Sequence, residues 1–242
     1  MIVGLLHPGE MGSAIGYALV ATGNDVIWAS EGRSAASKER AARFRDVGSV
    51  EAVAAEAALI LSVCPPHAAL DVARGVPGFE GVYVDANAIS PAHADEISHV
   101  HGRFVDGGII GPPPAAAGDT RLYLSGAEAA WAAGLFAGGI VEARVVPDAS
   151  AVKMTYAAWS KGTAAMLLAI HDVARFYGVG EALAAEWRES APELQARLAA
   201  AERSAARKGW RWIGEMEEIA DTFAAAGEPD GFHRAAAEVF RP

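Results

Sequence analysis

The 242-residue sequence predicts an α/β domain with a doubly wound, mostly parallel sheet, followed by an all-helical domain. Before residue 148, short apolar runs alternate with alanine-rich segments of helical pattern, as expected for a sheet with helices on both faces. After residue 148 no strand pattern is present, and glycine or proline separates the helical segments. We therefore predict domains at 1–148 and 149–242.

Each predicted strand of the first domain is a short apolar run. The runs are Ile2–Leu6, Asp25–Ala29, Leu59–Val63, Gly81–Asp85, Arg103–Asp106, Leu122–Ser125 and Ala143–Val146. In the second domain, breaks between helices are predicted at Gly178–Gly180, Pro192, Gly209 and Gly227–Pro229.

A long segment without proline opens the second domain. From Asp148 to about Phe176 it predicts one helix, with Asp148 as N-cap and Gly178 beyond its end. At 1.5 Å per residue this helix would be ~40 Å long, which suits a connection between the two domains.

Composition excludes several classes of protein. A formal net charge of −10 argues against nucleic acid as a partner, because phosphate binding needs a basic surface. One cysteine, Cys64, cannot form an intrachain disulfide and fits a reducing compartment, so we expect a cytoplasmic protein. A strand-like run beginning at Ile2 leaves no room for a secretion signal, and no apolar run approaches the ~20 residues that cross a bilayer.

The first 16 residues place a strand, a glycine turn and a helix start in succession. Gly9 would let the backbone approach a pyrophosphate, and Gly12 would let the helix pack closely on the sheet. This pattern predicts a Rossmann-type dinucleotide site lined by His7, Gly9, Glu10, Met11 and Gly12. His7 replaces the first glycine of the usual motif, and a turn that needs glycine only for packing is the alternative.

The loop after the second predicted strand bears on the choice of cofactor. Arg33, with Ser30 and Ser34, favours the 2′-phosphate of NADP, whereas Glu31 favours the ribose hydroxyl of NAD. We predict NADP, with NAD as the alternative. A solvated arginine at a helix start is the structural alternative for Arg33.

Five motifs together carry a resemblance to a known family. They are Val3–Gly12, Ser62–Pro66, Val84–Pro91, Asp106–Gly111 and Lys153 in its long helix. Taken together, they resemble the β-hydroxyacid dehydrogenase superfamily, which includes 6-phosphogluconate and 3-hydroxyisobutyrate dehydrogenases. The nearest branch is one of poorly characterised phosphogluconate-dehydrogenase-like proteins. The resemblance implies that Cys64, Pro65 and Pro66 line the cofactor and that Asn87 lies near its nicotinamide end.

The resemblance also implies a substrate loop at Ile110, Gly111 and Pro112, after a predicted strand. The superfamily usually has a serine and paired glycines there. Because Ile110 carries no hydroxyl that could bind a carboxylate, 6-phosphogluconate becomes a poorer candidate substrate.

The long helix carries the predicted catalytic residue. A lysine at the position of Lys153 moves a proton to or from the substrate hydroxyl in the superfamily, and such chemistry requires a general acid or base. Ala157 stands where the superfamily has a substrate-binding asparagine, and Tyr156 and Ser160 are the candidates to replace it. Lys161 lies further round the helix and is predicted to form an ion pair or a subunit contact.

Three functions follow as alternatives. The first is an NADP-dependent oxidoreductase acting on a small hydroxy acid or a related alcohol or carbonyl compound. The others are an imine reductase, for which Tyr156 is the candidate donor, and a non-catalytic sensor that binds NADPH. We expect a homodimer, because the helical domain is small and built around one long helix. No metal site is expected, since His99 and His101 lack further ligands.

Overall fold

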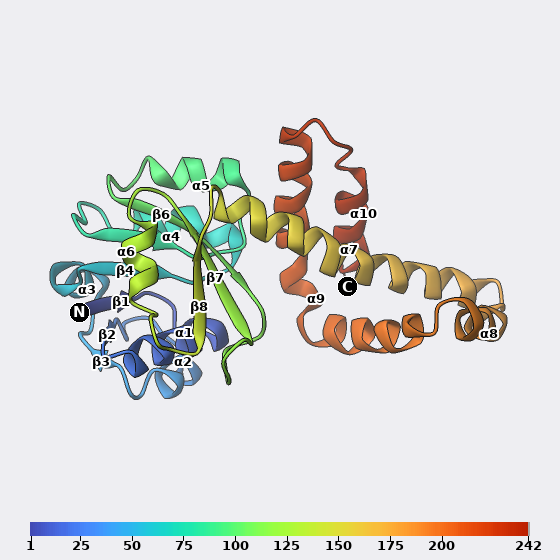
Figure 1. Cartoon of the computed structure of the whole chain (residues 1–242), viewed down its shortest axis with the longest axis horizontal. Coiled ribbons are helices and arrows are strands. Elements are labelled where there is room, and N and C mark those ends of the chain that lie inside the picture. The colour runs from blue at the N-terminus through green and yellow to red at the C-terminus, as the bar shows by residue number, and fades with distance from the viewer. Residues whose placement is uncertain (242) are drawn as a thin grey trace. The chain divides into compact units, whose positions relative to one another are not determined.

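The computed structural model describes residues 1–241 and divides into two compact units, which meet in the chain after Lys153. The first unit contains the sheet, and the second contains helices only (Figure 1). Among residues 1–241, no helix combines the length and the apolar character needed to cross a membrane.

Within the described residues the first unit has one eight-stranded sheet, in the order β3-β2-β1-β4-β5-β6-β7-β8. β6 and β7 are antiparallel, and every other neighbouring pair is parallel. The first six strands have the order of dinucleotide-binding α/β sheets, whose ligands lie beyond the carboxyl ends of the strands where the order reverses. That point lies between β1 and β4. The strands are β1 (Ile2–Leu5), β2 (Asp25–Trp28), β3 (Arg45–Asp46), β4 (Leu59–Ser62), β5 (Val82–Asp85), β6 (Phe104–Ile110), β7 (Thr120–Ser125) and β8 (Val141–Val145).

Helices cover both faces of this sheet, which explains the continuous apolar runs in its strands. Leu59 and Leu61 of β4 belong to a core with α1 and α6, whereas Ile60 belongs to a core with α3, α4 and α5. The helices of this unit are α1 (Glu10–Ala21), α2 (Ala35–Arg40), α3 (Val50–Glu56), α4 (Ala69–Arg74), α5 (Pro91–Ser98) and α6 (Ala129–Gly134), with the 3₁₀ helix η1 (Pro66–Ala68) before α4.

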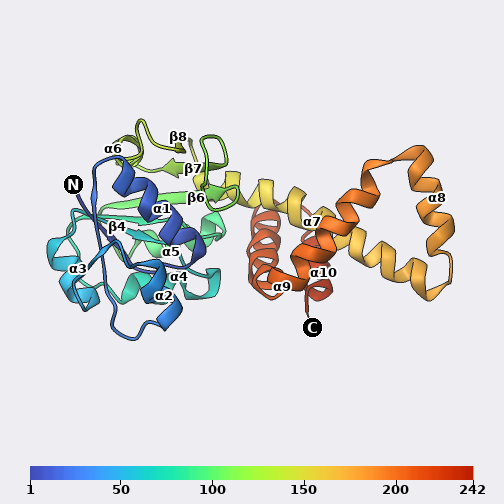
Figure 2. The same ribbon diagram turned by 90° about the horizontal axis from the view of Figure 1, so that it is seen from below.

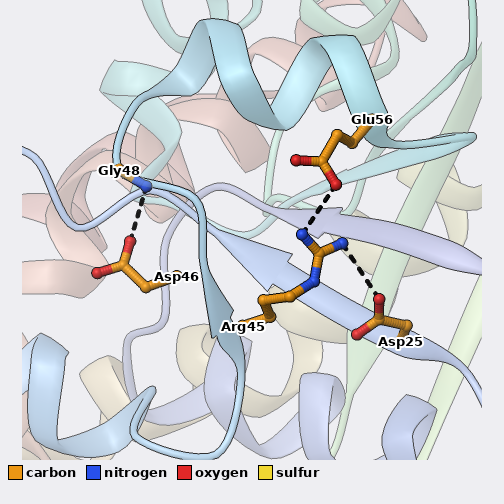
Figure 3. A network of polar contacts seen from close by, with 5 residues as sticks. All are labelled: Asp25, Arg45, Asp46, Gly48 and Glu56. Carbon is orange, nitrogen blue, oxygen red and sulfur yellow. Dashed lines mark hydrogen bonds and ion pairs between the residues drawn. The ribbon is translucent and has the colours of Figure 1, made fainter.

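All seven predicted strands are present, and β3 is a strand that the sequence did not predict. It contains two exposed charged residues, so it has no apolar pattern. Arg45 binds Glu56 at 2.8 Å and Asp25 at 3.2 Å, which ties β3 to α3 and β2 (Figure 3). Because these side chains are about half exposed to water, the two ion pairs contribute little to the stability of this edge.

β6 is longer than predicted, and this corrects the position of its glycines. The predicted strand Arg103–Asp106 ends before Gly107 and Gly108, but β6 continues through both glycines to Ile110. An added Cβ at Gly107 would lie 2.8 Å from the Asp85 carbonyl oxygen, so the glycine allows a close backbone approach inside the sheet.

The second unit is helical, as predicted. α7 (Ala149–Phe176) begins in the first unit and continues into the second, followed by α8 (Gly180–Ser190), α9 (Glu193–Ala225) and α10 (Gly231–Val239). α10 lies beside α9 in Figures 1 and 2. The predicted break at Gly209 is wrong, because α9 runs through it. Gly209 is buried in α9, with Phe240 on the neighbouring segment.

Candidate functional site

In the glycine turn between β1 and α1, Gly9 and Gly12 have different structural roles. An added Cβ at Gly12 would lie 2.2 Å from the His7 carbonyl oxygen, so the start of α1 packs too closely on the turn for any side chain. At Gly9 an added Cβ would meet no atom within 4 Å. The chain itself therefore needs glycine at 12 but not at 9, and the space beside Gly9 can admit a pyrophosphate. Glu10 is exposed in the first turn of α1, and Met11 is half-buried against the core.

Two nitrogens beside this turn are buried without a hydrogen-bond partner: His7 Nδ1 and Arg33 Nε. Burial, and next the Arg33 charge, lower the pKa of His7 to about 4, so its imidazole is neutral at pH 7. The Arg33 guanidinium also acts electrostatically on Cys64. Arg33 therefore lies near the ends of both β1 and β4. A buried donor without an acceptor is costly, and a phosphate oxygen would satisfy it.

The two serines near Arg33 have partners within the protein. The Ser30 amide donates to Asp46 Oδ1 at 3.2 Å, and the Ser30 hydroxyl also bonds this carboxylate. The Gly48 amide donates to the same oxygen at 2.9 Å (Figure 3). Ser34 is the N-cap of α2, where its hydroxyl accepts from the Ser37 amide at 3.2 Å. Glu31 is exposed. Arg33 is therefore the side chain of this loop with unused hydrogen-bonding capacity in the interior.

Asn87 joins the ends of β4 and β5 by hydrogen bonds. Its Oδ1 accepts from the Cys64 amide, and its Nδ2 donates to Asp85 Oδ2 at 2.8 Å and to Ser62 Oγ at 3.3 Å. Asn87 is only 2% exposed, so its side chain shapes the Cys64 loop from within. Burial raises the pKa of Asp85 to about 7, and burial with the Asp85 charge raises that of the Cys64 thiol to about 12, which makes the thiol unreactive.

Prolines begin the helices that follow β4 and β5. Pro66 opens η1 directly after Pro65, and both prolines are half-buried. Ser90 is the N-cap of α5 with Pro91 in its first turn, and the Ser90 hydroxyl accepts from the His93 amide at 3.3 Å.

The predicted substrate loop begins at the end of β6. Ile110 is paired with Arg121 of β7 and is only 3% exposed, so its side chain is buried against a face of the sheet. Gly111 has φ +122°, and an added Cβ there would lie 2.1 Å from the Asp119 carbonyl oxygen, so only glycine fits. Pro112 is exposed, and its carbonyl oxygen accepts from the Thr120 hydroxyl. Gly111 and Pro112 thus remain accessible, whereas Ile110 does not.

Lys153 lies one turn into α7 and is half-buried. Its Nζ donates to the Ile109 carbonyl oxygen at 2.9 Å, which places the amine at the carboxyl end of β6. An added Cβ at Gly108 would lie 2.8 Å from both the Lys153 Cβ and the Ala149 carbonyl oxygen. Glycine at 108 therefore lets α7 approach β6 closely enough for this contact.

Tyr156, Ser160 and Lys161 belong to the second unit. Tyr156 is 47% exposed, and Ser160 is exposed with its hydroxyl towards the Ala157 carbonyl oxygen at 3.5 Å. Lys161 forms an ion pair with Glu215 of α9, which is one of the two roles predicted for it. Both side chains are largely buried, at 16% and 11% exposed.

The two histidines considered as metal ligands have separate structural roles. His99 Nδ1 lies 2.7 Å from the Asp95 carbonyl oxygen, while His101 Nε2 lies 3.0 Å from that of Ala73. Among residues 1–241, no three His, Cys, Asp or Glu side chains are arranged to hold a metal ion.

The sequence reasoning did not identify Asp106, Ser125 and Ser150 as parts of the site. They form a buried hydrogen-bonded group that joins β6 and β7 to the first turn of α7, the turn before Lys153. The available signal was an aspartate directly before two glycines, but its partner Ser150 is 44 residues away in the chain.

Two family models match the chain. Residues 1–104 match a Rossmann-like domain, and residues 174–242 match a domain of unknown function, DUF1932. No curated protein matches the sequence.

Three solved structures illustrate the likeness of the whole chain. MTH1747 is a conserved protein of unknown function described as structurally similar to 3-hydroxyacid dehydrogenases. It is 27% identical, with a TM-score of 0.72 over 99% of this chain and 95% of its own. A 3-hydroxyisobutyrate dehydrogenase from Salmonella typhimurium is 19% identical, with a TM-score of 0.68 over 99% and 93%. A reductive aminase from Aspergillus terreus, in complex with NADPH and ethyl levulinate, is 18% identical, with a TM-score of 0.60 over 99% and 91%.

The predicted resemblance is confirmed at the level of domains and fold. A Rossmann-like domain followed by a helical domain is the architecture of the 3-hydroxyisobutyrate dehydrogenase-like proteins. At 19% and 18% identity, the second and third likenesses establish the fold alone.

Proposed function

We propose that this chain is an NADP-dependent oxidoreductase that transfers hydride between the nicotinamide and a small hydroxy acid or a related alcohol or carbonyl compound. The main supporting observation is the amine of Lys153, held on the Ile109 carbonyl at the carboxyl end of β6. In sheets of this topology, ligands bind beyond the carboxyl ends of the strands.

The cofactor assignment is supported by the fit of the glycine turn. The space beside Gly9 and the buried Nε donor of Arg33 match the shape and charge of a pyrophosphate or phosphate group, and His7 Nδ1 is a second buried nitrogen beside that space. Glu10, Met11 and Gly12 would form the remaining turn and helix start. The Cys64–Pro66 loop, shaped by Asn87, would line the same crevice.

In the proposed reaction, Lys153 is the general acid or base. A bound nicotinamide would accept the hydride from a carbinol carbon or return it to a carbonyl carbon. Lys153 Nζ takes the hydroxyl proton during oxidation and returns it during reduction. The Ile109 carbonyl orients the amine by accepting one N–H. Gly111 and Pro112 are the proposed substrate contacts of the first unit. Tyr156 and Ser160 are proposed from the sequence alone, as replacements for the asparagine that Ala157 displaces.

The preference for NADP rests mainly on Arg33, since the Ser30 hydroxyl bonds the Asp46 carboxylate and the Ser34 hydroxyl caps α2. Calorimetric titration should give a lower Kd for NADPH than for NADH. Arg33→Ala should reduce this difference about tenfold or more, because a charge-assisted bond to phosphate is lost. The matched control is Arg45→Ala, which also removes one positive charge but only from the ion pairs of β3. Equal Kd values for both cofactors in the wild type would contradict the assignment.

An imine reductase is the second candidate, and the fold shared with a reductive aminase favours it. A panel of hydroxy acids, aldehydes, ketones with amines, and cyclic imines, each with NADPH and NADH, separates the candidates. Turnover of hydroxy acids or aldehydes that depends on Lys153 supports the first proposal. Turnover of imines that survives in Lys153→Met but fails in Tyr156→Phe supports the second. Tight NADPH binding without turnover on any compound indicates a sensor.

We also propose that the chain forms a homodimer through its helical unit. α7 and α10 line an apolar groove of about 400 Å³, which includes Gly162, Met166, Phe232 and Val239. Met166 and Phe232 are 53% and 68% exposed. Large exposed apolar patches of this kind mark interaction surfaces.

A further inference from the structure

We propose that Asp106 is a positioning residue, which fixes the first turn of α7 on β6 and thereby holds the amine of Lys153 at its place. The inference rests on the proposed function, in which Lys153 moves the substrate proton. Asp106 itself touches neither substrate nor cofactor in this proposal.

The Asp106 carboxylate binds the start of α7 directly. Its Oδ2 accepts from the Ser150 amide at 2.7 Å, and its Oδ1 accepts from the Ser150 hydroxyl at 2.6 Å. Oδ2 also accepts from the Ser125 hydroxyl of β7 at 3.0 Å, and Ser125 Oγ in turn accepts from the Ala149 amide at 2.9 Å. Two of the first amides of α7 are thus bound by side chains of the sheet rather than by the helix's own segment.

These bonds are not needed simply to begin the helix. Asp148 already caps α7 from within its own segment, because its Oδ1 accepts from the Ala151 amide at 2.7 Å. Asp106, in contrast, is 9% exposed, and burial raises the pKa of its carboxyl group. Burying a carboxylate costs free energy, and Asp148 already caps the helix from its own segment. What the Asp106 carboxylate adds is therefore the connection between α7 and β6.

The connection continues along the same strand to Lys153. Asp106, Gly108 and Ile109 of β6 contact successive parts of the first turn: the Ser150 amide, the Ala149 backbone with the Lys153 Cβ, and the Lys153 amine. Lys153 is three residues after Ser150, so a shift of the first turn moves its side chain directly. Misplacing a reacting group by about 1 Å can lower a rate about 100-fold.

The first test measures the geometry and requires no substrate. The chain has four lysines, at 38, 153, 161 and 208, and the exposed Lys38 serves as internal reference. Limited trinitrophenylation followed by peptide mass spectrometry gives the labelling rate of Lys153 relative to Lys38. In Asp106→Ala this ratio should rise about fivefold, as expected when a stabilising contact of ordinary strength is lost. In Asp148→Ala, which removes a cap of the same helix but leaves the connection to β6, the ratio should stay within about twofold.

The second test uses the substrate found by the panel. At saturating cofactor, Asp106→Ala should lower kcat about 10- to 100-fold, while the calorimetric Kd for NADPH changes less than about threefold. Asp106→Asn keeps one acceptor oxygen and should recover part of kcat. Asp148→Ala should keep near-normal kcat. If Asp106→Ala does not fold, Ser150→Ala, which keeps the amide bond and removes only the hydroxyl bond, replaces it in both tests and should show a smaller change in the same direction.

The outcomes separate this inference from the proposed function. An unchanged Lys153 labelling ratio in folded Asp106→Ala, or an equal loss of kcat in Asp106→Ala and Asp148→Ala, overturns the positioning role. Normal kcat in Lys153→Met overturns the proposed mechanism instead, whatever the labelling of the Asp106 variants. Faster labelling together with the split between kcat and cofactor Kd supports the inference.

Discussion

His7 gives the cofactor turn a side chain where the usual motif has its first glycine. The imidazole is buried beside Arg33, and Nδ1 has no acceptor or donor within the protein. A neutral imidazole can remain beside a guanidinium without electrostatic repulsion, which is consistent with its lowered pKa. Histidine at position 7 therefore adds a neutral polar side chain to the turn and leaves the space beside Gly9 open.

The pKa of His7, lowered to about 4, predicts how stability depends on pH. Between the unfolded value of 6.5 and about 4, the unfolded chain binds a proton more readily than the folded one, so stability falls as pH falls through this window. Between pH 7.5 and 5.8, which stays above the pI of 5.2, the wild type should lose about 1 kcal/mol more unfolding free energy than His7→Gln.

Urea unfolding of both proteins at the two pH values measures this difference, and imidazole NMR signals give an independent check. The signals absent from the His7→Gln spectrum belong to His7, and they should show no protonation down to pH 5.8. Equal pH dependence of stability in the two proteins, with a His7 signal that titrates near pH 6.5, would contradict the buried neutral imidazole.

The buried ion pair of Lys161 and Glu215 predicts a large effect from changing one partner alone. Lys161→Met removes the positive charge that Lys161 places beside the Glu215 carboxylate, which is 11% exposed, and should destabilise the protein by about 3 kcal/mol. The double variant Lys161→Met with Glu215→Leu should recover most of that loss, because both charges are removed. Urea unfolding of the two single variants and the double variant measures this. Additive losses would show that the pair is not coupled.

At the scale of elements, Gly209 lies inside a helix, where glycine lowers stability, and not in a break between helices. Gly209→Ala should stabilise the protein by about 0.5–1 kcal/mol, because alanine favours helix and the added Cβ lies 3.7 Å from Ala205 Cβ and 3.9 Å from Phe240 Cδ1, which are ordinary contacts. Thermal unfolding should show a higher Tm. A lower Tm would mean that α9 and the Phe240 segment cannot accept one methyl group.

In the first unit the sequence predicted the strands that consist of short apolar runs. Leu59–Ser62 and Val82–Asp85 are buried on both faces, so their composition alone identified them. β3 was missed because Arg45 and Asp46 are charged and exposed, and the extension of β6 was missed because glycine has low strand propensity. Gly209 was misinterpreted because a glycine inside a helix and one between helices look alike in sequence.

At the scale of the molecule, local motifs predicted the glycine turn and the helix of Lys153 but not the contacts that hold them. The bond from Lys153 to Ile109 and the bonds from Ser150 to Asp106 each span 44 residues. The burial of Ile110 and the internal role of Asn87 likewise depend on strand neighbours. Such pairings follow from strand order and register, which single motifs do not specify.

The proposed dimer predicts that a charge in the α7–α10 groove separates the subunits. Light scattering at micromolar concentration should give about twice the 25.1 kDa mass of the chain for the wild type. Met166→Glu should shift this towards the monomer, because a carboxylate would be buried in an apolar contact. Ala130→Glu, on exposed surface of α6, is the control and should remain dimeric. A wild-type monomer would contradict the proposal.

The central claim is that Lys153 moves the proton in a dinucleotide-dependent reaction. The most direct measurement compares kcat of Lys153→Met with the wild type on the substrate that the panel identifies, with the NADPH Kd of both measured by calorimetry. A general acid or base contributes about 10²- to 10⁴-fold, so kcat should fall by that factor while the Kd stays within about threefold. Near-normal kcat in folded Lys153→Met would contradict the claim.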